Sequence, residues 1–308
     1  DELPIIVEKL RSKEHVDLII LISHLGFPQD MKLLSEVHGV DLCLSGHTHN
    51  RISEVVKQGN TLVIQSGCHG SFLGQIDLEL SNGKIIGYEH QLIEVDSNIT
   101  PDPEMSDIID NVLSPFNNLL NKVVGETATA MNRGGMLETT MDNFLLQSIL
   151  DVSGAEMAFS NGWRYGAPII PGEVSMNDLY NIIPMNPPIG VVEISGYELL
   201  EMLEENLENT FASDPFHQMG GYIKRALGIT VYIKIESPKG QRIQEIFVGN
   251  EPLSKSRIYQ VAFVTEQGVP QKYGSHRNKL KIHAVEAMHL YLEKHNPSHI
   301  ELQGTYIA

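Results

Sequence analysis

Three histidines follow two apolar segments, and their positions favour metal binding. His24 comes directly after residues 16–23, and His47 and His49 follow the second apolar segment, residues 40–45. Neutral imidazole binds Zn, Mn, Fe, Co or Ni. His47 and His49 are two residues apart, so in extended backbone their side chains would lie on the same side. We therefore expect the three histidines to be ligands of one metal cluster.

The elements around the histidines are expected to form a β-α-β unit. Residues 16–23 and 40–45 are nearly continuous apolar runs, which is typical of strands buried on both faces of a parallel sheet. A helical pattern lies between them, from Pro28 to Gly39. In open α/β sheets, ligands bind beyond the carboxyl ends of the strands, where the histidines lie. Gly46 would let the backbone approach closely there.

A third strand is expected to end at the same edge of the sheet. Residues 61–65 predict this strand, and His69 follows it. We expect His69 and Asn50 to lie behind the metal ligands and support them, although a surface role for His69 is an equal alternative. Residues 72–80 and 84–94 predict a β-hairpin around an Asn-Gly turn.

The carboxylates of a two-metal site are not apparent in the sequence. Such a site needs carboxylates, one of them usually bridging the metals. Asp41 lies early in its strand, at the wrong end, and Asp30 lies in the first turn of a helix, where helix electrostatics already explain it. We therefore assign no catalytic residue within the chain and expect the missing carboxylates upstream of Asp1.

The composition is that of a soluble, acidic globular protein. Of its 308 residues, 42% are hydrophobic, and the formal net charge is -17. This charge repels nucleic-acid backbones and anionic membranes, so neither partner is expected, and no apolar run reaches the roughly 18 residues of a membrane span. Cys43 and Cys68 are interpreted as small buried hydrophobes rather than as a disulfide or a ligand pair. Because the chain opens with Asp1 and not with Met, we interpret it as a processed product or a fragment.

A change of composition near Asp96 predicts a domain boundary. Asn, Asp and two prolines gather there. We expect an α/β domain at residues 1–96, a linker with a helix at 97–122, and an α+β domain at 123–308. In the last of these, helices are expected at about 140–152, 196–208 and 280–295, and strands at 190–194, 228–235 and 258–265.

The histidine motifs resemble those of a known enzyme family. Ser23-His24-Leu25-Gly26, Val40-Asp41 and Gly46-His47-Thr48-His49-Asn50 are similar, in order and spacing, to the later motifs of calcineurin-like metallophosphoesterases. The stretch from Gln65 to Gly74 resembles the 5'-nucleotidase branch, and residues 123–308 resemble its C-terminal substrate domain. The similarity covers nearly the whole chain.

This resemblance implies a mechanism and a cofactor. Two divalent metal ions, such as Mn or Zn, would activate a water for hydrolysis of a nucleotide or a related phosphate ester. His24, His47 and His49 match the family's histidine ligands. Residues 1–96 would be the C-terminal part of the metallophosphoesterase domain, because the family's earlier motifs are not in this chain.

The resemblance also implies substrate contacts in the second domain. The stretch from Asn161 to Gly166 is similar to a loop whose asparagine and arginine meet the nucleotide, so Asn161 and Arg164 are expected to bind substrate. Trp163 is expected either to join them or to be a core aromatic. Pro184-Met185 lacks one stacking aromatic, and residues 266–273 depart from the family's glycine-rich motif, which argues against the usual base clamp.

Three loops resemble a sister branch, the Sox-type thiosulfohydrolase, which hydrolyses a sulfonate from a carrier-protein cysteine. They are Arg133-Gly134-Gly135 with Met141-Asp142-Asn143, Trp163 to Gly172, and Asp214 to Gly221. Arg133 is accordingly expected to bind substrate. Because loops carry specificity, this resemblance bears on the substrate rather than on the fold.

Three hypotheses about function follow. The first is a 5'-nucleotidase-type phosphomonoesterase acting on a small nucleotide or phosphate ester. The second is a thiosulfohydrolase-like enzyme with a carrier-protein partner. The third is a non-catalytic binding module. The family resemblance suggests a periplasmic or extracellular location, with a cytoplasmic one left open.

Overall fold

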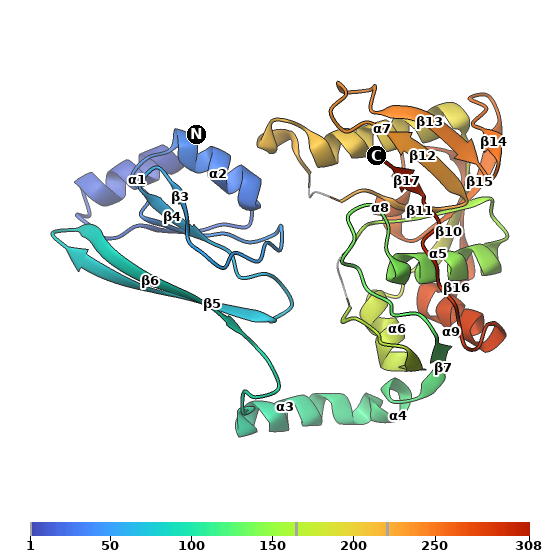
Figure 1. The fold of residues 1–308 in the computed structure, drawn as a ribbon, viewed down its shortest axis with the longest axis horizontal. Helices are drawn as coiled ribbons and strands as arrows, with labels where there is room; N and C mark the ends of the chain where they lie inside the picture. The colour runs from blue at the N-terminus through green and yellow to red at the C-terminus, as the bar shows by residue number, and fades with distance from the viewer. Residues whose placement is uncertain (1, 164–165, 220–221) are drawn as a thin grey trace. The chain divides into compact units, whose positions relative to one another are not determined.

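The computed structural model has the expected mixed α/β fold (Figure 1). It describes residues 2–163, 166–219 and 222–308. The chain divides into two compact units, one of Asp1–Ser106 with Ser213–Gly221 and the other of Asp107–Ala212 with Tyr222–Ala308. The domain limits expected from the sequence remain a proposal.

The first unit contains a four-stranded sheet with the strand order β1-β2-β4-β3. Its strands are β1 (Ile20–Ile22), β2 (Leu42–Leu44), β3 (Val56–Gln58) and β4 (Thr61–Ile64). Strands β1, β2 and β4 are parallel, and β3 is antiparallel to β4. Helix α2 (Phe27–Glu36) joins β1 to β2, which confirms the expected β-α-β unit.

A small apolar core supports this sheet. Helix α1 (Leu3–Ser12), which the sequence analysis did not predict, contributes Val7 to it. Leu34 of α2 and the strand residues Cys43 and Val63 complete its centre. The strands are shorter than the apolar runs, because only the residues with partners on a neighbouring strand form a ladder.

A long β-hairpin follows the sheet, as expected. It consists of β5 (Phe72–Ser81) and β6 (Lys84–Glu94). Asn82 and Gly83 form the turn with φ angles of 50° and 70°. Positive φ at both turn residues is typical of a type I′ turn, which matches the twist of the two strands.

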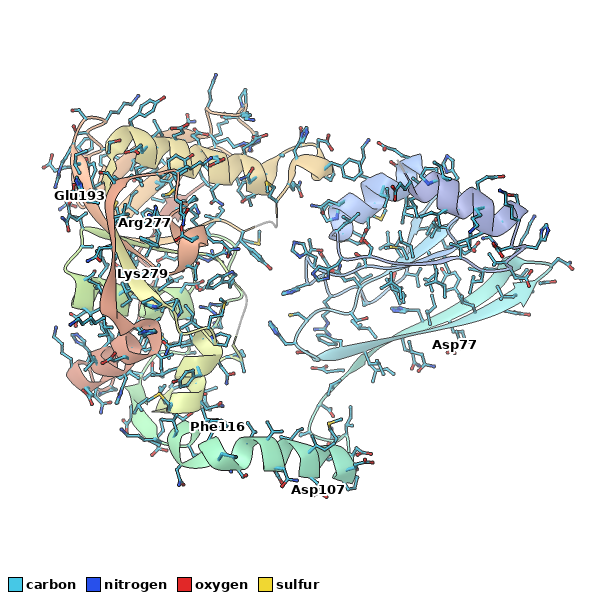
Figure 2. The ribbon with its side chains drawn as sticks, turned by 180° about the vertical axis from the view of Figure 1, so that it is seen from behind. Asp77, Asp107, Phe116, Glu193, Arg277 and Lys279 are labelled. Atoms are coloured by element: carbon cyan, nitrogen blue, oxygen red, sulfur yellow. The ribbon has the colours of Figure 1, made fainter. Side chains whose placement is uncertain are left out.

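The helix expected in the linker at 97–122 consists of three separate elements. Helix α3 (Pro103–Leu113) is followed by the 3₁₀ turn η1 (Ser114–Phe116) and by α4 (Asn117–Leu120). Figure 2 labels Asp107 on α3 and Phe116 in η1. Pro115 lies in η1 and cannot donate the backbone hydrogen bond that a continuous α-helix requires.

The second unit is built on two larger sheets. The five-stranded sheet has the order β11-β8-β15-β10-β16, and the four-stranded sheet has the order β14-β13-β12-β17. The strands of the first are β8 (Met157–Ser160), β10 (Pro188–Ser195), β11 (Arg225–Leu227), β15 (Ile258–Phe263) and β16 (Ser275–His283). Those of the second are β12 (Ile229–Ile233), β13 (Ile243–Val248), β14 (Glu251–Pro252) and β17 (Tyr306–Ile307). A further pair joins β7 (Val123–Thr127) to β9 (Gly172–Ser175).

Helices complete the second unit, and two of the expected ones are confirmed. These are α5 (Thr140–Ser153) and α7 (Gly196–Phe211), the latter begun by a capping box between Ser195 and Glu198. Helices α6 (Met176–Ile182) and α8 (Thr265–Gly268) are short. The apolar core includes Phe144 of α5 and Leu203 of α7, both fully or almost fully buried.

The helix expected at 280–295 begins later than predicted. Residues up to His283 belong to strand β16, and helix α9 covers Ala284–Lys294. Leu280 and Ile282 alternate with more exposed neighbours, a period of two, and β16 pairs with β10. Figure 2 shows Arg277 and Lys279 on β16 and Glu193 on β10.

Candidate functional site

The ends of β1 and β2 bring His24 and His47 together. Their ring centroids are 5.0 Å apart with an interplanar angle of 63°. A Cβ atom at Gly46 would lie 3.1 Å from Nδ1 of His24 and 3.3 Å from the carbonyl oxygen of Ser23. The absence of a side chain at Gly46 therefore permits this close approach. The strand-end rule thus accounts for this histidine pair.

The backbone at His47 and His49 is not extended, so the expectation that an extended segment holds their side chains on the same side was wrong. His47 has a φ of 74° and His49 a φ of 58°. Positive φ is uncommon for residues other than glycine and is enriched where a structure holds a functional site under strain. The reversed backbone turns His49 toward His69, with ring centroids 5.6 Å apart.

A cysteine joins this second histidine pair. The ligand atoms of His49, Cys68 and His69 all lie within 4.8 Å of one another. The two cysteines are not joined in a disulfide, as expected. Cys43 is a buried core residue, and burial raises its pKa to about 12. The interpretation of Cys68 as a buried hydrophobe was wrong, because Cys68 is only partly buried and lies in a turn after β4.

Asp30 connects the two strand ends that carry His24 and His47. Its carboxylate is fully buried and accepts hydrogen bonds from the hydroxyls of Ser23 (2.5 Å) and Ser45 (2.6 Å). Helix electrostatics alone therefore do not explain Asp30. The sequence signal that was missed is a serine just before each histidine motif, since each serine supplies a donor to the same carboxylate.

Gln65 supports the loop from Gly46 to Asn50. It is buried at the end of β4, and its amide nitrogen donates to the hydroxyl of Ser45 and to the carbonyl of Gly46, both at 2.9 Å. Its amide oxygen accepts from the backbone N–H of Asn50. The side chain of Asn50 is exposed, so the contact shown here is made by its backbone. Sequence reasoning missed Gln65, which carried no motif of its own.

The donor chemistry of these loops fits borderline divalent metals. Imidazole and thiolate suit Zn, Fe or Co. Asp30 and Asp41, the carboxylates nearest to the histidines in sequence, have other partners: Asp30 accepts the two serine hydroxyls, and Asp41, at the other end of β2, accepts from Arg11 and from the backbone N–H of Ile19. The histidines therefore fit one side of a two-metal centre.

In the second unit, Asn161 and Trp163 converge on a residue that the sequence analysis did not single out as a site. The side-chain oxygen of Gln267 accepts from Nδ2 of Asn161 (2.7 Å) and from Nε1 of Trp163 (3.0 Å). Asn161 follows β8, and Gln267 lies in α8, after β15. These strands are parallel neighbours, so the loops after their carboxyl ends meet. Arg164 lies outside the described residues.

Lys224 lies beside this group. Its ammonium donates to the backbone carbonyl of Gln267, and only 8% of the residue is exposed. Burial lowers the pKa of Lys224 to about 8, while the negative charge of Glu205 opposes the shift. A buried cation near the loop that is expected to bind substrate can attract an anionic ligand. No motif pointed to it, because burial of a lysine is a tertiary property.

The described contacts of Arg133 are structural. Nε of Arg133 donates to Asp142 at 2.9 Å, and Nη1 donates to the carbonyl of Ile182 at 2.7 Å. Arg225 pairs with the other oxygen of Asp142, also at 2.9 Å. The side chains of both arginines are almost completely buried. Substrate binding by Arg133 stays a prediction.

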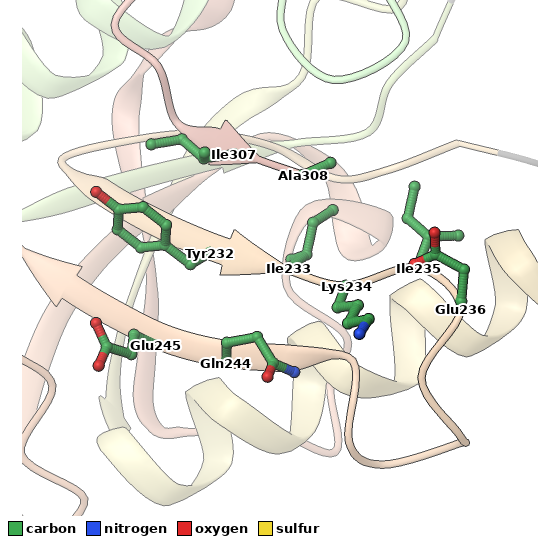
Figure 3. Close-up of a pocket in the computed structure, with 9 residues that line it drawn as sticks. All are labelled: Tyr232, Ile233, Lys234, Ile235, Glu236, Gln244, Glu245, Ile307 and Ala308. Atoms are coloured by element: carbon green, nitrogen blue, oxygen red, sulfur yellow. The ribbon is translucent and has the colours of Figure 1, made fainter.

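A hollow in the second unit lies apart from the residues expected to do chemistry. Figure 3 shows it between β12, β13 and β17. Its lining includes Tyr232, Lys234, Glu236, Gln244, Glu245 and Ile307. None of the expected site residues lines it, and we assign it no role.

Comparisons with known proteins agree with the fold and motifs. The family described as 5'-nucleotidase, C-terminal domain, matches residues 123–265. The trifunctional nucleotide phosphoesterase YfkN of Bacillus subtilis is 25% identical over 254 residues, covering 78% of this chain and 17% of YfkN. A 5'-nucleotidase of Diplobatis ommata is 22% identical over 299 residues, covering 82% of this chain and 51% of that enzyme.

Two solved structures cover almost the whole chain. The sulfate thiohydrolase SoxB of Thermus thermophilus superposes with a TM-score of 0.90 at 26% identity, covering 99% of this chain and 56% of SoxB. A 5'-nucleotidase precursor from the same organism superposes with a TM-score of 0.83 at 20% identity, covering 98% and 66%. The chain thus spans between 17% and 66% of the length of these four relatives.

The descriptions of these relatives can be compared with the partners and the family expected from the sequence. YfkN is described as a nucleotide phosphoesterase, the Diplobatis ommata enzyme as a 5'-nucleotidase and SoxB as a sulfate thiohydrolase, and these descriptions do not support the expected carrier protein. None of the helices in the described part of the chain is both long and apolar enough to cross a membrane. Residues 123–265 match the family of 5'-nucleotidase C-terminal domains, and the chain is similar to 5'-nucleotidases and to SoxB, which confirms the expected resemblance.

Proposed function

We propose that this chain is part of a metal-dependent phosphoric ester hydrolase of the 5'-nucleotidase type, with a role in nucleotide catabolism. The observation that carries the proposal is the meeting of His24 and His47 at the ends of two parallel strands. The match of residues 123–265 to the 5'-nucleotidase C-terminal domain supports it. The substrate class is a nucleotide or a related phosphate ester.

In this proposal, the two units have separate tasks. His24, His47 and His49 hold one side of a centre of two divalent ions, and bound ions of this kind supply Lewis-acid polarisation of a phosphoryl group. Asp30 and Gln65 keep the histidine loops in position through Ser23 and Ser45. These residues orient the metal centre but do not touch the substrate.

The second unit would bind the organic part of the substrate. Asn161 and Trp163 offer an amide and an indole, and Arg164 would add a guanidinium for an anionic or carbonyl-rich group. Gln267 holds Asn161 and Trp163 in one place. We assign the remaining metal ligands and the acid that assists the leaving group to a part of the protein beyond these 308 residues.

The test is phosphate release from AMP by a protein extended at its N-terminus, with Mn²⁺ or Zn²⁺ added. We expect turnover by the extended protein and negligible turnover by the 308-residue chain. His47→Ala should reduce the activity by more than the roughly 100-fold that loss of a supporting residue can cost. His38→Ala is the control, because His38 is exposed in the same unit. Full turnover by the 308-residue chain alone would contradict the division of the site.

A second candidate is a thiohydrolase acting on a sulfonate. The similarity to SoxB, at 26% identity and a TM-score of 0.90, favours it. The loop from Asp214 to Gly221, which suggested this branch, is described only as far as Met219. Sulfate release from a cysteine-bound thiosulfonate, with none of the AMP hydrolysis expected above, would replace the first candidate by the second. Binding of ligand without turnover in either assay would indicate a binding module.

Asp30 offers a test of how the metal centre is positioned. Asp30→Asn keeps the shape of the side chain but removes the charge that holds two serine hydroxyls. Supporting residues of this kind typically change metal affinity by about 10- to 100-fold. We expect a loss in this range for Mn²⁺, measured by electron paramagnetic resonance titration of the extended protein.

The control for Asp30 is Asp41→Asn. Asp41 also accepts hydrogen bonds near a strand of the same sheet, but it pairs with Arg11 at the other end of β2. We expect this variant to keep the Mn²⁺ affinity of the wild-type protein. Equal losses in the two variants would show that Asp30 acts only through the general stability of the unit.

We also propose that the protein is exported. The relatives include a snake venom 5'-nucleotidase from Naja atra and a 5'-nucleotidase precursor. Fractionation of the cells that make the protein tests this proposal, which predicts it outside the cytoplasm.

A further inference from the structure

We propose that His49, Cys68 and His69 form a three-donor metal site with a thiolate ligand, suited to Zn²⁺. The three ligand atoms lie within 4.8 Å of one another. The proposal does not rest on the hydrolase function, because it requires only these three residues. His49 is common to both sites.

The donor set selects a class of metal. One thiolate and two imidazoles favour Zn²⁺ and similar borderline ions over Mg²⁺ or Mn²⁺, which prefer oxygen ligands. Zinc sites with three protein ligands keep a fourth position for water or another ligand. Cys68 and His69 would thus add a preference for zinc that the histidine motifs alone do not specify.

The geometry requires only a small adjustment. Zn–S and Zn–N bonds of about 2.3 and 2.0–2.1 Å in a tetrahedron place the donors about 3.3–3.6 Å apart. In the structure the three ligand atoms lie within 4.8 Å of one another, a limit a little over 1 Å larger than the spacing in such a tetrahedron. His69 is exposed, and Cys68 and His49 are partly buried, so rotation of side chains can close this difference without moving the core.

Backbone contacts hold the two loops side by side. The N–H of Gly67 donates to the carbonyl of Asn50 at 2.9 Å, and the N–H of Ile52 donates to the carbonyl of Gln65 at 3.2 Å. Arg51 and Ser66 form an antiparallel bridge between these contacts. The loop with His49 and the loop with Cys68 are therefore connected by their main chains, independently of any metal.

The turn that carries Cys68 and His69 is also well defined. The N–H of Ser71 donates to the carbonyl of Cys68 at 3.0 Å, and the two central residues, His69 and Gly70, have φ angles of 56° and 69°. A positive φ is unfavourable at a histidine. This conformation presents the imidazole of His69 on the same side as the thiol of Cys68.

Cobalt titration of the 308-residue chain tests the site, because Co²⁺ bound to a thiolate gives a sulfur-to-cobalt charge-transfer band. We expect this band in the wild-type chain and not in Cys68→Ser. Cys43→Ser is the matched control and should keep the band, because Cys43 is buried in the core. His49→Ala and His69→Ala should each weaken Co²⁺ binding by more than the roughly 10- to 100-fold cost of losing a supporting residue.

Alkylation of the wild-type chain gives an independent measurement that needs no variant. Zn²⁺ should slow the reaction of Cys68 with iodoacetamide, whereas Mg²⁺ should not, because a metal-bound thiolate is a poor nucleophile. Peptide mass analysis separates Cys68 from Cys43. Lack of the cobalt band together with unchanged alkylation in Zn²⁺ would overturn the proposal.

Two further variants separate this site from the hydrolase centre. His24→Ala and His47→Ala remove ligands of the proposed hydrolase but none of the three donors, so the cobalt band should persist. If the extended protein failed to hydrolyse AMP while the band was present, the hydrolase proposal would fail and the thiolate site would stand. Loss of the band in these variants would show that the thiolate does not form a site of its own.

Discussion

Replacing Asp142 by alanine is expected to lower the free energy of unfolding by about 3–5 kcal/mol, the range found when one partner of a buried ion pair is removed. The carboxylate of Asp142 has no exposed surface and pairs with both Arg133 and Arg225, each at 2.9 Å. Its removal would leave two buried guanidinium groups without their shared counter-charge. We therefore expect a large loss of stability from this single substitution.

The surroundings of Asp142 explain why the loss should spread. Thr139 caps helix α5 and donates its hydroxyl to Asp142 at 2.7 Å. Arg225 donates to the backbone carbonyls of Gly135 and Met136 at 2.8 and 2.7 Å. The carboxylate thus connects the start of α5, the loop with Arg133 and strand β11.

Urea denaturation of the two variants Asp142→Ala and Asp178→Ala would measure the effect. Asp178 occupies the same third helical position, in α6, and is held by a capping box with Ser175, but it pairs with no arginine in the described structure. Replacing Asp178 by alanine should lower the free energy of unfolding by about 0.5–2 kcal/mol, the range for the loss of a helix cap. Equal losses would show that the ion pairs contribute little beyond helix capping. Adding Arg133→Met and Arg225→Met to Asp142→Ala should recover part of the loss.

The second large effect is a pH dependence of stability caused by Lys224. Burial lowers its pKa to about 8 from the ordinary value of 10.5. Between these two values the unfolded chain binds more protons than the folded chain, so stability rises with pH. Below pH 8, burial of the charged Lys224 therefore lowers the free energy of unfolding by about 3 kcal/mol. This loss disappears as the pH rises and Lys224 becomes neutral in the folded chain.

The measurement is the free energy of unfolding of the wild-type protein and of Lys224→Met between pH 7 and about 10. We expect the wild-type protein to gain about 2–3 kcal/mol relative to the variant over this range. The range stops there because burial raises the pKa of Tyr306 above 10. Above this pH only the unfolded phenol ionises, and stability falls.

Lys272→Met is the matched control for Lys224→Met. Lys272 is exposed and pairs with the same Glu205, at 2.6 Å. Its replacement should change the stability by a small amount that does not vary with pH over this range, because exposed pairs contribute about 0–1 kcal/mol. If the difference in the free energy of unfolding between the wild-type protein and Lys224→Met does not change with pH, Lys224 is not the cause of the pH dependence.

The sequence by itself determined the local elements around the histidines. Two apolar runs joined by a helical pattern predicted β1, α2 and β2, because strand and helix patterns are written in consecutive residues. The expected burial of both strands on both faces was wrong for β1, where Ile20 and Ile22 are exposed. The hairpin with Asn82-Gly83 followed from turn chemistry. The strand-end rule also predicted correctly that His24 and His47 would meet, since parallel strands joined by a helix end at the same edge.

Residues 280–283 show where local patterns were insufficient. The spacing of Leu280 and Ile282 fits a strand, and together with the residues after them it also fits a helix. The strand forms because these residues pair with β10. The φ angles of His47 and His49 likewise depend on the whole loop, which Gln65 and the backbone contacts of Asn50 hold.

Only the tertiary structure decided which polar groups share a site. Four groups bring together residues from different elements: Asp30 with Ser23 and Ser45, Cys68 with His49, Lys224 with Gln267, and Asp142 with Arg225. Their chemistry depends on burial and on distances between atoms, which no single segment of sequence contains. The sequence determined the types of donor that the chain offers, and the tertiary contacts decided their partners and their charge.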